Sequence, residues 1–474
     1  MREYGSIIAG EQRFSGEWIE IRNPYSQEVV GRVASIDKAA TEEAIRQTRA
    51  SKITLSRHER HQILNKMGER LKAEIDSVSR LITSESGLSL KDTRHEVSRS
   101  SDVLRFAAMH SLMDDSEIFP CDVSSIGRAR RIYTMRLPLH LVAAITPFNH
   151  PLNQVVHKIA PSIATNNTMI LKPSLQTPLA AHYVVQLAIE CGLPPNMVNV
   201  VCGSASDVAE TLVSSDQVEM ITFTGGNKVG RRIASLAGYK RLVLELGGGS
   251  SMLVLEDAGV QQAVELAVKG VFANSGQRCT AIRRLLVHES LADEFAAALT
   301  EECSKLAYGD PYDPCTDVGT VITEQAAIQI EQRVQQSIRM GSKLLVGHRR
   351  AGAIYPPTVL DHVCVDHPVV AEETFGPVAC IVRFRNLEEG IRMANQTPYG
   401  LSGAVVSNHW PSIQRCITEI EAGTINVNEV PGFRLEWSPF GGIKASGLGY
   451  KEGVIEAMKS MTYVKTYSLP WDRP

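Results

Sequence analysis

The sequence LVAAITPFNHPLNQVVHKIAPSIATNNTMILKPS, residues 141–174, begins with a short apolar run, continues through a longer amphipathic segment and closes on a second short apolar run. Short apolar runs bounded by turn residues are typical of buried strands, and the longer segment between them is typical of a helix. Strands and helices that alternate at this spacing predict right-handed βαβ units in a doubly wound parallel sheet. The pattern continues to residue 247, with strands predicted at Leu141–Thr146, Thr168–Pro173, Met197–Cys202, Glu219–Thr224 and Leu242–Leu246, and helices that include Pro178–Cys191 and Asn227–Ala237.

A second alternating region, from Ser250 to about Val427, predicts a second α/β domain. Gly247-Gly248-Gly249 joins the two domains, and residues without a Cβ allow a sharp change of chain direction there. A flexible loop at the end of a strand explains the same three glycines equally well. The predicted helices are Val260–Phe272, Leu291–Leu306 and Ile322–Met340, and the predicted strands are Ile282–Val287, Val378–Val382 and Thr424–Val427.

Two segments fit neither domain. Tyr133, Met135 and Leu137 alternate with Thr134 and Arg136, as in a half-buried antiparallel strand, and the tail after Met461 alternates similarly. Strands apart from a packed sheet need an edge to pair with, so we expect an arm that joins the subunits of a homodimer or homotetramer. The expected division is a first domain of residues 1–117 and 138–247, a second of residues 248–447, and an arm of residues 118–137 and 448–474.

Composition narrows the classes of partner. The chain has 474 residues, 43% of them apolar, with 49 Lys and Arg against 52 Asp and Glu and a net charge of −3. No long basic run is present, so neither a nucleic-acid nor a membrane-surface partner is expected. No apolar run approaches the roughly 18 residues of a membrane span and Met1–Gly5 contain no signal core, so we expect a cytoplasmic protein with a small-molecule substrate. The nine cysteines form no CxxC pair, which argues against a disulfide framework and a structural metal site.

Cys279 is the candidate nucleophile among these cysteines. It lies in NSGQRCT, residues 274–280, just past an apolar helical segment and between small or polar residues. Such a loop exposes a thiol, and the neighbouring Arg278 is expected to favour the thiolate. An isolated cysteine is more often an inert core residue, so Cys279 needs support from other motifs.

Two further polar residues follow predicted strands of the first sheet. Asn149, in PFNHP, comes directly after the strand that begins at Leu141, and Glu245, in LELGG, ends another. Ligands of open α/β sheets bind at the carboxyl ends of strands. An amide there can hold an oxyanion, although Asn149 could equally cap the helix before Pro151. A partly desolvated Glu245 can act as a general base, whereas a surface glutamate is the commoner case.

These motifs resemble the aldehyde dehydrogenase superfamily. The resemblance also includes FTGG at 223–226, EETFGPV at 372–378 and SPFGGIKASGLG at 438–449, in family order over nearly the whole chain. It implies a Rossmann-like cofactor domain, a catalytic domain and NAD(P)-dependent oxidation of an aldehyde. Cys279 would form a thiohemiacetal held by the Asn149 amide and the Cys279 N–H, hydride loss would leave a thioester, and Glu245 would activate water.

The resemblance also separates this reaction from two alternatives. Members that transfer the acyl group to coenzyme A usually lack a carboxylate at the Glu245 position, so the free acid is the expected product. A non-catalytic structural protein on the same scaffold is the alternative from another class. The intact set of Cys279, Asn149 and Glu245 argues against it.

The cofactor is expected to be NAD, with NADP open. Lys172 resembles the lysine that binds the adenosine ribose, and Thr224 begins the segment near the pyrophosphate, where helix N–H groups favour anions. Glu373 and Phe375 resemble the pair that holds the nicotinamide ribose and ring. Many NAD-preferring relatives carry Glu at the position of Leu175, so the choice of cofactor is not decided. The cofactor residues implied by the resemblance are Thr146, Pro147, Phe148, Lys172, Ser174, Thr224, Gly225, Gly226, Leu246, Glu373 and Phe375.

The substrate positions carry an unusual number of potential cations. The residues implied by the alignment are His150, Arg278, Arg434 and Thr280, with Arg99 on the predicted helix Thr93–Ala107. Guanidinium groups suit a multiply charged oxyanion because their planar forks bond two oxygens. The alternative is that Arg278 only tunes the thiol and that Arg434 and Arg99 are solvated.

Sequence detail favours a substrate with a terminal oxyanion. GQRCTAIRR at 276–284, PFNHPLNQVVHKIAP at 147–161 and NEVPGFRLEWSPFGGIK at 428–444 look most similar to the phosphonoacetaldehyde dehydrogenase branch, which oxidises phosphonoacetaldehyde to phosphonoacetate. Non-phosphorylating glyceraldehyde-3-phosphate dehydrogenase is the second possibility. Sulfoacetaldehyde and succinate semialdehyde are further candidate substrates.

Overall fold

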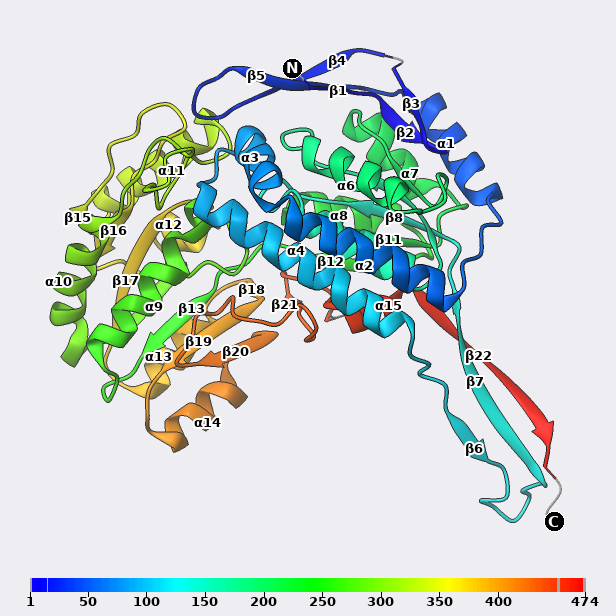
Figure 1. Cartoon of the computed structure of the whole chain (residues 1–474). Coiled ribbons are helices and arrows are strands. Elements are labelled where there is room, and N and C mark those ends of the chain that lie inside the picture. The colour runs from blue at the N-terminus through cyan, green and yellow to red at the C-terminus, as the bar shows by residue number, and fades with distance from the viewer. Residues whose placement is uncertain (1, 15, 450–451, 472–474) are drawn as a thin grey trace.

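The chain folds into two α/β lobes, each built on a seven-stranded sheet, and a β arm that extends away from them (Figure 1). The computed structural model describes residues 2–14, 16–449 and 452–471. The expected domain ranges 1–117 and 448–474 therefore include residues that lie outside the described ones. The fold class predicted from the sequence, two doubly wound parallel-sheet domains with a small β arm, is confirmed.

The first sheet has the strand order β12-β11-β8-β9-β10-β2-β3. The five strands from β8 to β12 run parallel, and β2 pairs antiparallel with β10. Each predicted strand is present within two residues of its expected bounds. The strands are β2 Ser6–Ile8, β3 Glu11–Arg13, β8 Leu141–Ile145, β9 Thr168–Lys172, β10 Val198–Val200, β11 Met220–Thr224 and β12 Arg241–Glu245.

Helices cover both faces of this sheet because its side chains alternate between two apolar cores. Val142 and Ala144 of β8 pack with helices α2 to α6, whereas Leu141 and Ala143 pack with α1, α7 and α8. The helices are α1 Lys38–Ala50, α2 Arg57–Ala73, α3 Ile75–Ser86, α4 Leu90–Ser111, α5 Asn153–Ala164, α6 Leu179–Glu190, α7 Glu210–Ser214, after a π-helical turn at Ala205–Ala209, and α8 Asn227–Leu236.

The second sheet has the order β15-β16-β17-β14-β13-β19-β20, with only β15 antiparallel. Helices α9 and α10 pack on one face, and α11, α13 and α14 on the other. The strands are β13 Ser251–Val254, β14 Arg284–His288, β15 Lys343–Val346, β16 Thr358–Asp361, β17 Val378–Phe384, β19 Ser402–Val406 and β20 Thr424–Val427. The helices are α9 Val260–Phe272, α10 Glu289–Lys305, α11 Glu324–Arg339, α12 Pro368–Ala371, α13 Leu387–Asn395 and α14 Trp410–Glu419.

Two smaller sheets complete the lobes, and the sequence did not predict them. One has the order β1-β5-β4, and the other pairs β18 with β21. Their strands are β1 Arg2–Tyr4, β4 Trp18–Arg22, β5 Val29–Ala34, β18 Tyr399–Gly400 and β21 Ile443–Lys444.

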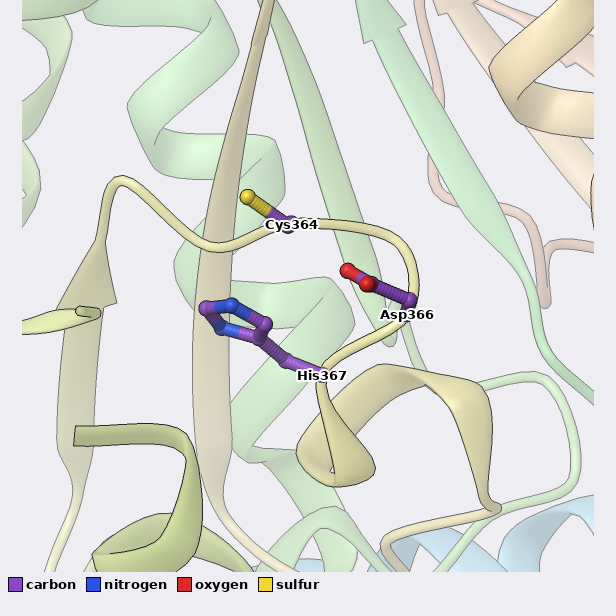
Figure 2. Close-up of side chains that lie close together, drawn as sticks. All are labelled: Cys364, Asp366 and His367. Carbon is purple, nitrogen blue, oxygen red and sulfur yellow. The ribbon is translucent and has the colours of Figure 1, made fainter. Parts of the chain in front are cut away.

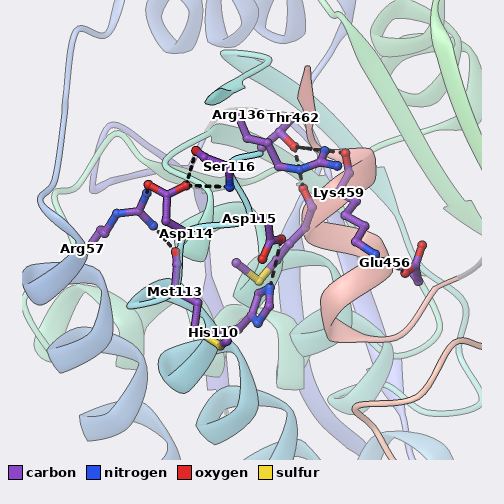
Figure 3. Close-up of polar contacts among 11 residues, drawn as sticks. Arg57, His110, Met113, Asp114, Asp115, Ser116, Arg136, Glu456, Lys459 and Thr462 are labelled. Atoms are coloured by element: carbon purple, nitrogen blue, oxygen red, sulfur yellow. Dashed lines mark hydrogen bonds and ion pairs between the residues drawn. The ribbon is translucent and has the colours of Figure 1, made fainter. Parts of the chain in front are cut away.

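The arm is an antiparallel sheet of β6 (Ile118–Pro120), β7 (Arg130–Pro138) and β22 (Thr462–Pro470). Helix α15 (Val454–Ser460) packs into the first lobe, so the part of the chain just before β22 lies with the body of the molecule. Figure 3 shows the base of the arm, where the Arg136 guanidinium donates to Thr462 Oγ1 at 3.3 Å. Nearby, Arg57 binds Asp114 at 2.9 Å and ties α2 to the segment that enters β6.

The glycines between the two lobes lie very close to other parts of the chain. None of Gly247, Gly248 and Gly249 has a positive φ. A Cβ on Gly248 would lie 2.0 Å from the carbonyl oxygen of Cys279, and one on Gly247 would lie 2.5 Å from Glu373 Oε2. The missing Cβ atoms of Gly247 and Gly248 therefore let the segment after β12 approach Glu373 and the loop that carries Cys279.

Candidate active site

A cavity of about 380 Å³ lies between the two lobes and brings Cys279, Asn149 and Glu245 together. The first lobe contributes the residues that follow β8, β11 and β12. The second contributes the loop before β14, the start of α11 and the segment after α12. Cys279 thus faces a cavity and is not sealed in a core. The other residues that line it are Pro147, Phe148, Gln154, Gln176, Thr224, Gly225, Gly226, Leu246, Gly247, Gln277, Ile322, Thr323, Gln325, Ala326, Gln329, Glu373 and Phe375.

A strained turn positions the Cys279 loop. Asn274 and Ser275 have φ values of 60° and 51°, in the left-handed region that side chains other than glycine rarely adopt. Each such residue costs on the order of 1–3 kcal/mol and persists only where its surroundings hold it. Here the Asn274 side-chain amide donates to the backbone oxygen of Asn149 at 2.9 Å. The turn therefore joins the loop before β14 to the loop after β8.

The Asn149 side chain also binds the loop that carries Cys279. Its Nδ2 donates to the backbone oxygen of Gln277 at 2.8 Å, two residues before Cys279. One amide proton remains for an oxyanion on a substrate bound at the sulfur. The helix-cap alternative is wrong, because α5 begins at Asn153 and Glu96 Oε1 accepts its N-terminal N–H groups, from Leu152 and Asn153.

Glu245 ends β12 and is only 4% exposed, which excludes the alternative of a surface glutamate. Its backbone oxygen accepts from Gly225 N at 3.0 Å, and the following Leu246 N donates to Ser446 O at 3.0 Å. These bonds hold the end of the strand on both sides. The carboxylate consequently faces the same cavity as the Cys279 sulfur.

Burial controls the protonation of Cys279. Burial raises the pKa of the thiol to about 11, Arg434 and Arg278 lower it, and Glu245 and Glu373 raise it further. The expectation that Arg278 favours the thiolate has the right sign for that residue. The expectation is wrong for the net effect, because desolvation raises the thiol pKa more than the two arginines lower it. The free enzyme therefore has a protonated thiol.

A pH profile of alkylation tests this balance. With the thiol pKa raised to about 11, the labelling rate of Cys279 by iodoacetamide should rise about tenfold per pH unit between roughly pH 7 and 10. Peptide mass spectrometry separates Cys279 from the other eight cysteines. A rate that levels off below about pH 9 would contradict the raised pKa.

Phe148, Phe375 and Glu373, three of the residues expected to bind the cofactor, all line the cavity. The two rings meet edge to face with centroids 5.9 Å apart. Burial raises the pKa of Glu373, and its Oε1 accepts the Gly248 N–H at 2.9 Å. Arg333 of α11 donates to the Glu373 backbone oxygen at 2.7 Å. These two contacts hold Glu373 in place in the cavity between the lobes.

Buried polar atoms show that this region suits a polar cofactor. Thr146 Oγ1, Thr224 Oγ1 and Gln154 Oε1 are buried and find no hydrogen-bond partner within the described part of the chain. Unsatisfied buried polar atoms are costly, and a dinucleotide with hydroxyls and phosphates would satisfy them. Helix α8 also begins just after Gly226, so its first N–H groups face the position expected for a pyrophosphate.

Two other residues expected to bind the cofactor, Lys172 and Ser174, lie at the carboxyl end of β9, at the same edge of the sheet. Lys172 ends β9, and burial lowers the pKa of its ammonium group. Ser174 follows it and accepts a hydrogen bond from Gln176 N at 3.2 Å. Leu175 packs beside the apolar cluster that contains Leu179. The position that carries Glu in many NAD-preferring relatives thus holds an apolar contact.

Glu436, which the sequence did not reveal, contacts two of the residues expected to bind the substrate. This buried carboxylate binds Arg99 of α4 and His157 of α5, and Arg434 Nη2 lies 3.8 Å from it. Burial alone would raise the pKa of Glu436, but His157, Arg434 and Arg99 together hold it well below its usual range. Neither arginine is a solvated charge, so that alternative is wrong for both.

His150 and Arg278 differ from the expectation of a simple row of cations. Burial, with Arg99, Arg278 and Arg434 nearby, holds the pKa of His150 well below its ordinary value, so the ring is neutral at pH 7. Arg278 Nη2 donates to the backbone oxygens of Lys269 and Gly270, at 3.0 and 2.9 Å.

One group on this side remains open to a ligand. The Nε of Arg278 is buried and has no hydrogen-bond partner among the residues that the structure describes. Thr280 packs against the loop that carries Arg434, where a Cβ on Gly432 would come within 2.5 Å of its Oγ1. Four of the five expected substrate residues lie near one another, because the charges of Arg99, Arg278 and Arg434 all lower the pKa of His150.

The chain matches the aldehyde dehydrogenase family over residues 11–467. It is 34% identical to 3-sulfolactaldehyde dehydrogenase of Priestia aryabhattai, over 98% of this chain and 97% of that protein. Among solved structures, NADP-dependent glyceraldehyde-3-phosphate dehydrogenase of Bacillus halodurans, complexed with NADP, superposes with a TM-score of 0.96 at 33% identity and full coverage of both chains. Aldehyde dehydrogenase 21 of Physcomitrella patens, in complex with the reaction product succinate, gives a TM-score of 0.95 at 30% identity, covering 99% and 98% of the two chains.

Proposed function

The chain belongs to the aldehyde dehydrogenase family and is an NAD(P)-dependent enzyme, and we propose that it oxidises a short aldehyde with a terminal oxyanion, specifically phosphonoacetaldehyde, to the free acid. The observation that carries this proposal is the pair of arginines, Arg99 and Arg434, that contact one buried carboxylate, with Arg434 near enough to Cys279 for its charge to lower the pKa of the thiol. The relatives named above act on a sulfonated aldehyde and a phosphorylated aldehyde or bind a dicarboxylate product.

The residues of the cavity divide the reaction into two halves. The deprotonated Cys279 sulfur adds to the aldehyde carbon, and the new oxyanion accepts from the free Asn149 N–H and the Cys279 backbone N–H. Each such donor is typically worth about 10²–10³ in rate. Glu373 and Phe375 would hold a nicotinamide, which when bound would supply the acceptor for the hydride lost from this carbon. Glu245 then takes a proton from water, the hydroxide adds to the thioester carbon, and the acid leaves as the Cys279 thiolate is restored.

Charge supports the choice of an anionic substrate. Arg99 and Arg434 together carry two positive charges, and Glu436 supplies one negative charge. Burial lowers the pKa of His157, which leaves its ring neutral and the cluster with an excess of positive charge. A buried excess charge is unfavourable unless a counter-ion joins it, and a phosphonate provides two or three acceptor oxygens.

Removing one arginine should change substrate preference. Arg434→Leu is expected to lower kcat/KM for phosphonoacetaldehyde by about 10- to 100-fold more than kcat/KM for propanal, since a charged hydrogen bond is worth about 1.5–3 kcal/mol, whereas the effect of Arg434 on the pKa of Cys279 is lost for both aldehydes alike. Arg105→Leu is the matched control, because this residue lies on α4 and its side chain is 58% exposed.

An equal loss on both aldehydes would remove the proposal of an anion pocket. The same assay compares glyceraldehyde 3-phosphate, sulfoacetaldehyde and succinate semialdehyde as alternative substrates, each with NAD and with NADP. Product analysis with coenzyme A present distinguishes the free acid from an acyl-CoA. Formation of acyl-CoA alone would favour the coenzyme A branch, and no turnover of any aldehyde would favour a structural protein.

We also propose that the arm joins subunits in a homodimer or homotetramer. Its sheet presents an edge and an apolar surface that one chain leaves uncovered. Light scattering of the purified chain measures its oligomeric state, and a monomer at micromolar concentration would contradict this proposal. The exposed apolar residues are Ile118, Phe119, Ile132, Tyr463, Val464, Tyr467 and Leu469.

A further inference from the structure

Three metal-ligating side chains meet outside the catalytic cavity. Cys364, Asp366 and His367 lie on the loop that connects β16 to α12, with one ligand atom from each residue within 4.8 Å of the others. Figure 2 shows the three side chains close together on this loop. We propose that these residues bind a zinc ion. None of them lines the catalytic cavity, and the sequence analysis expected no metal site.

The ligand set suits Zn²⁺ better than a harder cation. A thiolate, an imidazole and a carboxylate are the three groups that zinc binds in proteins, at about 2.0–2.3 Å, whereas Mg²⁺ and Ca²⁺ prefer oxygen alone. Tetrahedral geometry with these bond lengths places ligand atoms about 3.5 Å apart. The ligand atoms lie within 4.8 Å of one another without an ion, so zinc binding requires them to move closer together. Three protein ligands leave the fourth position to water.

The backbone of the loop is already arranged for binding. His367 N donates to Cys364 O at 3.0 Å, which closes a tight turn and fixes the two outer ligands. Val363 N donates to Ile381 O of β17 at 3.0 Å, and His367 O accepts from Ala371 N of α12 at 2.8 Å. The turn is thus held to the sheet on one side and to a helix on the other. Little backbone order has to be gained when the ion binds.

A second residue orients the imidazole. His367 is buried, and its Nδ1 lies 2.7 Å from the Ser342 hydroxyl oxygen. When Nδ1 donates to this oxygen, the lone pair of Nε2 is left for the metal, the arrangement that metal-binding histidines usually have. Cys364 and Asp366 are exposed, so an ion can reach the site from solvent.

Zinc titration of the full-length enzyme tests the site. The protein is treated with a chelator, dialysed and titrated with Zn²⁺ against a chromophoric competitor, in a Cys279→Ala background that removes the thiol of the catalytic cavity. One equivalent of Zn²⁺ should bind, and Cys364→Ser and Asp366→Asn should each weaken this binding at least tenfold. Cys315→Ser is the matched control, because Cys315 is also an exposed cysteine with carboxylates close in the sequence. Unchanged binding in Cys364→Ser would overturn the proposal.

Two further measurements report directly on the Cys364 thiol, and the second of them needs no variant. Co²⁺ bound in place of Zn²⁺ should give a thiolate-to-metal charge-transfer band in the protein with Cys364 and in Cys315→Ser, but not in Cys364→Ser. Zn²⁺ should also slow the alkylation of Cys364 at least tenfold in peptide mass spectrometry while leaving Cys315 unprotected. Absence of the band, or equal labelling of both cysteines, would show that the ion does not bind here.

Discussion

Cys279→Ala should lower turnover of every aldehyde by about 10⁴-fold or more, because the variant lacks the sulfur that forms the covalent intermediate. The rest of the cavity should remain intact. Alanine removes a single sulfur atom from a half-buried position, so the Tm and the affinity for NAD or NADP should stay close to those of the parent. Cofactor reduction followed by absorbance gives the rate, and calorimetry gives the binding constant.

Cys315→Ser serves as the control for this variant, because Cys315 is exposed and does not line the cavity. It should retain the parent rate with each cofactor. Turnover by Cys279→Ala at more than a few per cent of the parent rate would eliminate a thioester on this residue. Lost cofactor binding would instead show that the substitution disturbs the fold.

The sequence predicted the five parallel strands of the first sheet and three strands of the second, β14, β17 and β20, because these strands lie in apolar runs, whereas β13, β15, β16 and β19 were not predicted. The run from Leu141 became β8, and α9 has the expected bounds of Val260–Phe272. The N-terminal strands were missed because their residues give no such signal. Strand β3 is Glu-Gln-Arg with every side chain exposed, and it exists only because β2 offers an edge. Short polar strands are thus defined by their neighbours.

In the site, residues within motifs could be predicted from the sequence, whereas features that depend on distant neighbours could not. Cys279, Asn149 and Glu245 stand in recognisable motifs, and the structure brings all three to one cavity. Glu436 gave no signal of its own, because its contacts with Arg99 and His157 join residues 337 and 279 positions apart. The pKa of Cys279 could not be inferred from Arg278, since burial of the loop between two lobes decides it.

Glu245→Gln should separate the two halves of the reaction. A carboxamide cannot accept a proton from water, so hydrolysis of the thioester should slow by about 10²–10⁴-fold. Cys279 and Asn149 are unchanged, so the first half should still run once. Stopped-flow absorbance should show a burst of one reduced cofactor per active site followed by a slow phase, and intact-protein mass spectrometry should show the acyl group on Cys279.

A matched variant and an external nucleophile sharpen this experiment. Glu265→Gln on the exposed side of α9 should behave as the parent enzyme does. Hydroxylamine should restore multiple turnovers in Glu245→Gln, because it attacks the thioester without a general base. If the burst disappears together with the steady-state rate, Glu245 must act before the hydride leaves. Its carboxylate would then be the group that deprotonates a thiol whose pKa burial raises to about 11, and the two halves of the reaction would share one base.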